Sequence, residues 1–150
     1  MDRVILQQFI VKKLQRGLAI NILVRGSSMN PVLKEGDLIT IRRKECEEGD
    51  ILVFLYAGDE LLVHRLLKRA EGYFYCKGDN SFRLEQVPEK DILGVVEKLN
   101  GKAIRKCSSE FLEESERINQ IFIAHQCDVE KVRETPAYQE YCKKYITYTM

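Results

Sequence analysis

The sequence predicts a mainly β protein, in which a small folded-over antiparallel sheet or barrel lies between an N-terminal helix and a C-terminal helical extension, so that the class overall is α+β. Short runs of β-branched and aromatic residues recur between residues 19 and 100, and Gly-Asp pairs punctuate them. The patterns on both sides of this stretch are helical. With 150 residues, 45% of them apolar, the chain suits one compact core.

The first segment, residues 1–18, is expected to contain an amphipathic helix over residues 3–16. Its apolar positions keep roughly one face and comprise Val4, Phe9, Val11 and Leu14. A helix of this kind is expected to pack on the core. A helix that binds a membrane surface or a partner is the alternative.

The second segment, residues 19–100, is expected to form the β domain. Six strands are predicted, at residues 20–24, 38–41, 51–56, 61–67, 73–76 and 92–96. No true repeat relates them.

The third segment, residues 101–150, is expected to be helical. Ser108 or Ser109 can cap a first helix, and a second should begin near Asp128 and restart at Pro136. Its tyrosine stripe is interpreted as core or interface and comprises Tyr138, Tyr141 and Tyr145.

Charge and cysteine content exclude several classes. The net charge is +1, and the short basic run 42–44 is followed at once by glutamates, so nucleic-acid binding is not expected. The five cysteines are odd in number and form no Cys-x-x-Cys pair, which argues against a disulfide framework or a zinc site. No metal or cofactor is expected, and unpaired thiols favour the cytoplasm.

The sequence predicts no membrane-spanning segment, because it has no apolar run of 18 residues and no signal-peptide layout at its start. Peripheral membrane contact stays open.

Gly26-Ser27-Ser28-Met29-Asn30-Pro31 is the segment most informative about chemistry. It follows a predicted strand, and a hydroxyl on such a turn can project from the sheet while its own N–H faces a substrate carbonyl oxygen. Ser28 is therefore a candidate nucleophile. Taken alone, the segment is an ordinary turn.

His64 is the candidate general base, because an imidazole titrates near neutral pH and can accept a serine proton. A core histidine in an apolar strand is the plainer interpretation, and His125 lies on a charged helix. Asp79 and Glu85 are candidates to orient His64, since a carboxylate on the second ring nitrogen fixes the tautomer. The sequence does not decide between these two acids.

In this order the segments resemble the boxes of type I signal peptidases, over about residues 20–97. The matching segments are Gly26–Pro31, Gly49–Phe54, Val63–Leu66, Tyr75–Asn80 and Ile92–Val96. The resemblance implies a serine peptidase of the histidine-base type, with Ser28 and His64 as catalytic pair. It implies an oxyanion site at Ser27 and Ser28, where many relatives carry a serine in place of Gly26. Met29 and Pro31 are candidate substrate contacts.

The resemblance implies an extended peptide or protein substrate with small residues before the cut, and the lack of an anchor favours a soluble leader peptide. A non-catalytic peptide- or partner-binding module on the same fold is the alternative. A self-cleaving regulator is a third hypothesis, which is less favoured because such domains use lysine as the general base.

The resemblance also implies an apolar surface near the active site, which membrane-anchored relatives dip into the bilayer. The candidate residues here are Met29, Val32, Leu33 and 54–56. The helices after Ser108 are predicted to pack on the β domain and cover this surface.

Overall fold

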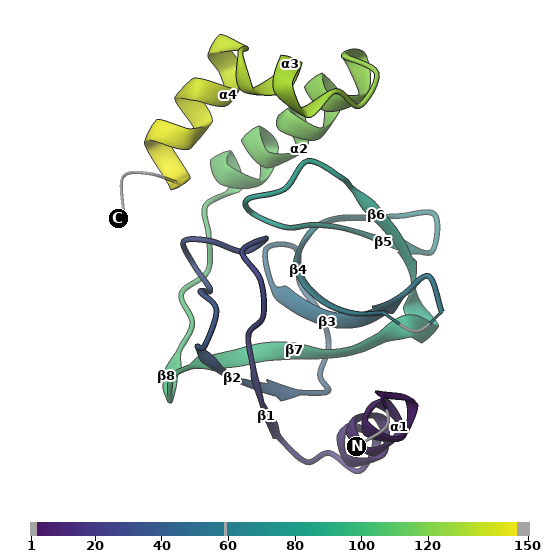
Figure 1. Cartoon of the computed structure of the whole chain (residues 1–150). Coiled ribbons are helices and arrows are strands. Elements are labelled where there is room, and N and C mark those ends of the chain that lie inside the picture. Colours follow the sequence, from purple (N-terminus) through teal and green to yellow (C-terminus); the bar gives the residue numbers. More distant parts are fainter. Residues whose placement is uncertain (1–2, 59, 147–150) are drawn as a thin grey trace.

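The computed structural model describes residues 3–58 and 60–146. Its strands are β1 (Ile20–Leu23), β2 (Leu38–Arg42), β3 (Ile51–Tyr56), β4 (Glu60–Ala70), β5 (Tyr73–Lys77), β6 (Glu85–Pro88), β7 (Ile92–Leu99) and β8 (Lys102–Ala103). They pair antiparallel in the order β1-β2-β7-β3-β4-β5-β6, with β8 beside β7. The sheet curls into a half-barrel (Figure 1). The predicted fold class is confirmed.

The N-terminal helix α1 (Arg3–Gln15) packs through one side on the sheet. Ile10 and Leu14, one helical turn apart, are buried against the strand residues, whereas Phe9 is 52% exposed. The predicted helix is confirmed, but its buried face is rotated from the predicted one. The side chain of Val4 lies outside the described residues.

Alternation along β3 divides the core of the sheet. Ile51 and Val53 face one cluster together with α1, while Leu52 and Phe54 face a second cluster under β5 and β6. Each face of β3 therefore has an apolar layer against it.

The predicted apolar surface near the site is largely interior. Met29, Leu33 and Phe54 are almost fully buried within the β domain itself, and only Val32 is exposed. The expectation that these residues form one surface patch was wrong, because the loop after Gly26 turns its apolar side chains inward.

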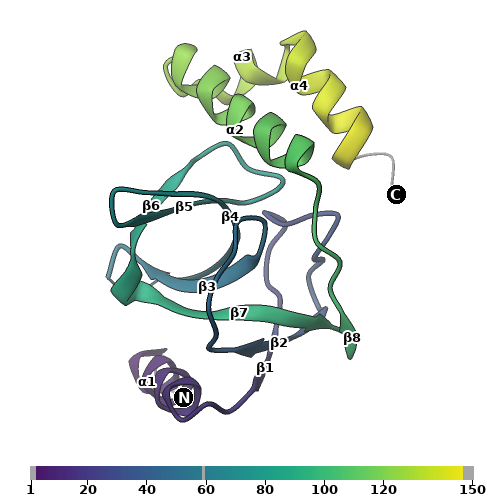
Figure 2. The ribbon, with the colours of Figure 1, turned by 180° about the vertical axis from the view of Figure 1, so that it is seen from behind.

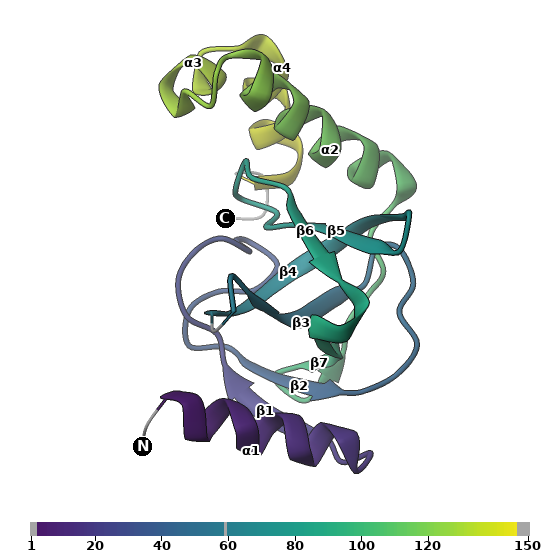
Figure 3. The ribbon, with the colours of Figure 1, turned by 90° about the vertical axis from the view of Figure 1, so that its right-hand side faces the viewer.

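The C-terminal region consists of α2 (Ser109–Ala124), α3 (Val129–Arg133), α4 (Pro136–Tyr141) and the π-helical turn η2 (Cys142–Ile146); the 3₁₀ turn η1 (Glu89–Asp91) precedes β7. Ser108 caps α2 by accepting a hydrogen bond from the Phe111 N–H, and Asp128 caps α3. These helices and α1 lie at opposite ends of the sheet (Figures 2 and 3). None of the described helices is long and apolar enough to cross a bilayer.

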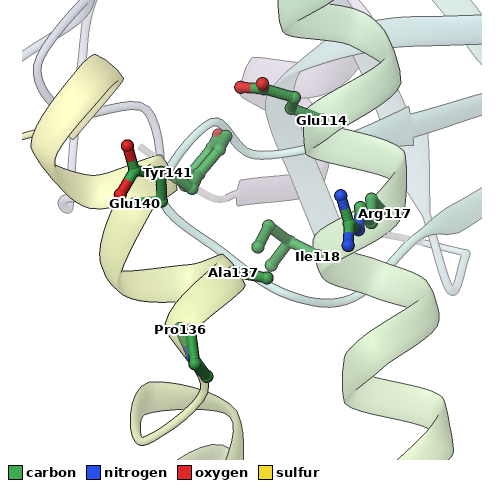
Figure 4. Close-up of a pocket in the computed structure, with 7 residues that line it drawn as sticks. All are labelled: Glu114, Arg117, Ile118, Pro136, Ala137, Glu140 and Tyr141. Atoms are coloured by element: carbon green, nitrogen blue, oxygen red, sulfur yellow. The ribbon is translucent and has the colours of Figure 1, made fainter.

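The helical region has a small core of its own, built around Phe111, Ile118, Val132 and Tyr141, and Phe82 from the β5–β6 loop packs against it. Figure 4 shows the cleft between α2 and α4, where Ile118 and Ala137 point toward each other. Because Phe82 joins this core, the helices are attached to the loop that follows β5.

Candidate active site

The loop after β1 carries Ser28. Gly26 has a φ of +79°, a left-handed conformation that favours glycine and reverses the chain direction after the strand. Ser28 is partly exposed, and within the described part of the chain its N–H has no hydrogen-bond acceptor. The loop therefore presents both a hydroxyl and an unused backbone donor.

His64 lies on β4, opposite Leu52 of β3, and is 6% exposed. Its Nε2 is 3.0 Å from the Ser28 Oγ. With a carboxylate on Nδ1, the neutral ring carries its proton on Nδ1 and leaves Nε2 to accept from the serine hydroxyl. This is the geometry that a general base needs.

Glu85 supplies the carboxylate on the other side of the ring. Leu66, Cys76 and Glu85 form one row across β4, β5 and β6, and His64 is two residues from Leu66 on the same face. The Glu85 Oε1 is 2.7 Å from the His64 Nδ1, and Glu85 is fully buried. Strand pairing therefore aligns the imidazole between a serine and a carboxylate.

Asp79, the other acidic candidate, contacts a different partner. Its carboxylate accepts two hydrogen bonds from Arg65, from Nε at 2.9 Å and from Nη2 at 2.8 Å. Burial acts to lower the pKa of Arg65, but the hydrogen bonds and charge of Asp79 outweigh it and leave the pKa raised. Of the two acids that the sequence left open, only Glu85 touches His64.

The segment Gly78–Asp79–Asn80 holds the loop that carries Ser28. The Asn80 N–H donates to the Ser28 carbonyl at 2.8 Å, and its side-chain amide donates to the Ser27 carbonyl at 3.2 Å. A β-carbon on Gly78 would lie 2.6 Å from the Ser28 carbonyl oxygen and 3.1 Å from the His64 Nε2. Glycine is needed there because the backbone packs directly on both catalytic candidates.

Met29 and Pro31, the predicted substrate contacts, differ in their placement. Met29 is 2% exposed, and its sulfur accepts a hydrogen bond from the Asp79 N–H at 3.4 Å, so it supports the site from inside. Pro31 borders a cavity with Val32 and Phe111. Ser27, the other residue of the predicted oxyanion site, is exposed. His125, the second histidine of the chain, is the C-cap of α2.

Sequence reasoning gave no role to Lys77, which is fully buried behind the site. Its ammonium group donates to the Gly78 carbonyl at 3.1 Å and to the Ser115 Oγ at 2.9 Å. Burial lowers its pKa to about 8, although the charges of Asp79 and Glu85 oppose this shift. The only sequence signal was a lysine at the end of an apolar strand.

The half-barrel brings together Ser28, His64 and Glu85, the hydroxyl, imidazole and carboxylate that serine peptidases combine for nucleophilic catalysis. In the comparison with protein families, residues 6–97 match the family model Peptidase S24-like, and the chain belongs to this family. The match supports a peptidase-type enzyme in general and does not single out the type I signal peptidases. No curated protein matches the chain. Among the described residues, no group of His, Cys, Asp and Glu is placed to hold a metal.

Proposed function

We propose that this protein is a serine endopeptidase of the histidine-base type, related to type I signal peptidases, that cleaves a leader or signal-type peptide. The observation that carries the proposal is the continuous line of contacts from the Ser28 Oγ through both nitrogens of His64 to Glu85, at 3.0 and 2.7 Å. The family match supports the peptidase class.

In the proposed reaction the Ser28 Oγ attacks the scissile carbonyl carbon while the His64 Nε2 takes the hydroxyl proton. Glu85 stabilises the imidazolium that forms, and the Ser28 N–H donates to the carbonyl oxygen as it becomes negative. The C–N bond then breaks as His64 gives its proton to the leaving amine. Water, deprotonated by His64, hydrolyses the acyl-enzyme and regenerates Ser28.

The proposed substrate is an extended peptide added alongside a strand. The order of the sheet supports this, because β1 is an edge strand that pairs, among the described strands, with β2 alone, and its chain runs directly into the loop that carries Ser28. Substrate residues on the N-terminal side of the scissile bond would then lie along β1 while the scissile carbonyl reaches Ser28.

The proposed place of action is the cytoplasm, and the proposed substrate a soluble leader peptide. Cys46, Cys76, Cys107 and Cys127 are free thiols, as expected in a reducing compartment. In this proposal, residues 19–100 carry the catalytic residues, and the segments 1–18 and 101–150 support the structure of that region.

Labelling with a fluorophosphonate probe tests the proposal, because the probe phosphonylates only an activated serine, with loss of fluoride, in a step that stands in for acylation by a peptide. We expect the wild type to be labelled at Ser28 and Ser28→Ala to lose the label, with Ser109→Ala, at an exposed helical serine, as matched control. His64→Ala should slow labelling by about a thousandfold or more. Equal labelling of Ser28→Ala would remove Ser28 as nucleophile. No labelling of the folded wild type would favour the non-catalytic module.

A further inference from the structure

Three hydrogen bonds in the described part of the chain join the helical region to the end of β5 and to the β5–β6 loop. The Tyr141 hydroxyl donates to the Asp79 carbonyl at 2.6 Å, and the Asn119 amide donates to the Phe82 carbonyl at 2.8 Å. The third bond is that from Lys77 to the Ser115 Oγ. The helices therefore bind the backbone of this loop on both sides of Asn80.

The same loop contacts the candidate nucleophile on its other side. The N–H of Asn80, the residue after Asp79, donates to the Ser28 carbonyl, and Gly78 lies against the His64 ring. A displacement of the Asp79 carbonyl would therefore move the donor that holds the Ser28 backbone. The contact with the helices and the contact with Ser28 are made by the carbonyl and the N–H of a single peptide group.

These contacts are buried, so water cannot readily replace them. Tyr141 is 4% exposed and Ser115 is fully buried. Tyr141 also lies against the Lys77 ammonium group, 5.6 Å from its ring centre, and Phe111 lies against Arg65, which holds Asp79. Removing the Tyr141 hydroxyl would leave a buried carbonyl without this donor, which favours a shift of the loop.

We propose that Tyr141 is a positioning residue of the catalytic site, and that the helical region from α2 to η2 sets the distance between Ser28 and His64 by holding the Asp79 carbonyl. The inference rests on the proposed function of Ser28 and His64. It assigns the helices a role in catalysis.

The test compares Tyr141→Phe with Tyr145→Phe. Tyr145 packs on the rings of Phe111 and Tyr141, and in the described part of the chain no hydrogen bond joins its hydroxyl to the loop. For each variant, the rate constant of phosphonylation by the fluorophosphonate and the probe's affinity are measured separately. We expect the rate constant of Tyr141→Phe to fall about ten- to a hundredfold with little change in affinity. Tyr145→Phe should stay within about twofold.

Hydrogen exchange adds a measurement that does not depend on activity. In Tyr141→Phe, peptides covering residues 26–30 and 78–82 should exchange faster than in the wild type and in Tyr145→Phe. If Tyr141→Phe does not fold, Ser115→Ala is measured in the same way, with a smaller loss expected.

Wild-type acylation rate and exchange in Tyr141→Phe would overturn the inference. A wild type that is never labelled, together with faster exchange in Tyr141→Phe, would instead reject the proposed function while retaining the coupling between helix and loop. The two failures are therefore distinguishable.

Discussion

His64 and Arg65 are neighbours on β4, yet they project to opposite faces and meet different carboxylates. His64 contacts Glu85 on one face and also reaches the partly exposed Ser28. Arg65 contacts Asp79 on the other face, beneath Phe111 of the helical region. Both pairs are buried and have short contacts, so burial and contact distance alone do not identify a catalytic pair.

The difference lies in what else each side chain touches. The Nε2 of His64 meets a hydroxyl beside an unused backbone donor, whereas the Nη1 of Arg65 donates to the Gly49 carbonyl at 2.8 Å. All three guanidinium nitrogens of Arg65 therefore donate to fixed acceptors of the fold, while His64 contacts a hydroxyl that can react. The expected consequences of mutation differ accordingly.

The largest effect is expected for Glu85→Gln. An amide keeps the shape of the side chain but cannot stabilise the imidazolium or fix the same tautomer, so the rate of serine acylation should fall by about 10⁴-fold. Pre-steady-state labelling with a fluorophosphonate measures it. A rate within tenfold of the wild type would show that Glu85 is not the orienting acid.

Gly78→Ala should displace the loop where it contacts Ser28 and His64. The new methyl group would lie 2.6 Å from the Ser28 carbonyl oxygen, so the loop or the nucleophile must shift, and acylation should slow by about a hundredfold or more. The same labelling assay checks this, with circular dichroism to confirm folding. An unchanged labelling rate would contradict the close approach of Gly78 to Ser28 and His64.

Asp79→Asn should affect stability more than chemistry. It leaves the buried Arg65 guanidinium without its carboxylate, and the free energy of unfolding should drop by about 3–5 kcal/mol. Urea unfolding measures the loss. The acylation rate of the folded fraction should fall far less than in Glu85→Gln. The reverse ranking would exchange the roles of the two acids.

The smallest effect concerns Lys77, which lies between the two pairs. Its pKa is lowered from 10.5 to about 8 in the folded state, so between these values the unfolded chain holds more protons and stability rises with pH. From pH 7.5 to 9, the unfolding free energy of the wild type should rise by about 1 kcal/mol relative to Lys77→Met. Urea titrations at both pH values test the sign. Parallel curves would mean that the amine titrates normally.

The parts of the fold predicted from sequence are those with local signals. Apolar runs between Gly-Asp pairs marked β1 to β5 and β7, and Ser108 and Asp128 marked helix starts that the structure confirms. β6 was missed because Glu85–Pro88 has a buried carboxylate and a proline in place of an apolar run. Proline is tolerated there because β6 is an edge strand.

The candidate site divides in the same way. Residue type and local context made Ser28 and His64 candidates, but only the resemblance to type I signal peptidases joined them as a pair. Their contact depends on the tertiary structure. The choice between Asp79 and Glu85 depended on pairing across three strands, which no local pattern encodes. The links from Ser115 and Tyr141 to the site could not be predicted, because their spacing indicates only an ordinary helical core.

The hydrogen bond from Tyr141 to Asp79 also has a consequence for biosynthesis. Ribosomes make the chain from its N-terminus, so Ser28 and His64 emerge long before Tyr141. The β domain can pair its strands while the helical region is still unmade, but the Asp79 carbonyl lacks its tyrosine donor until translation has passed residue 141. The nascent chain therefore carries its candidate nucleophile before it carries the group that donates to the neighbouring loop.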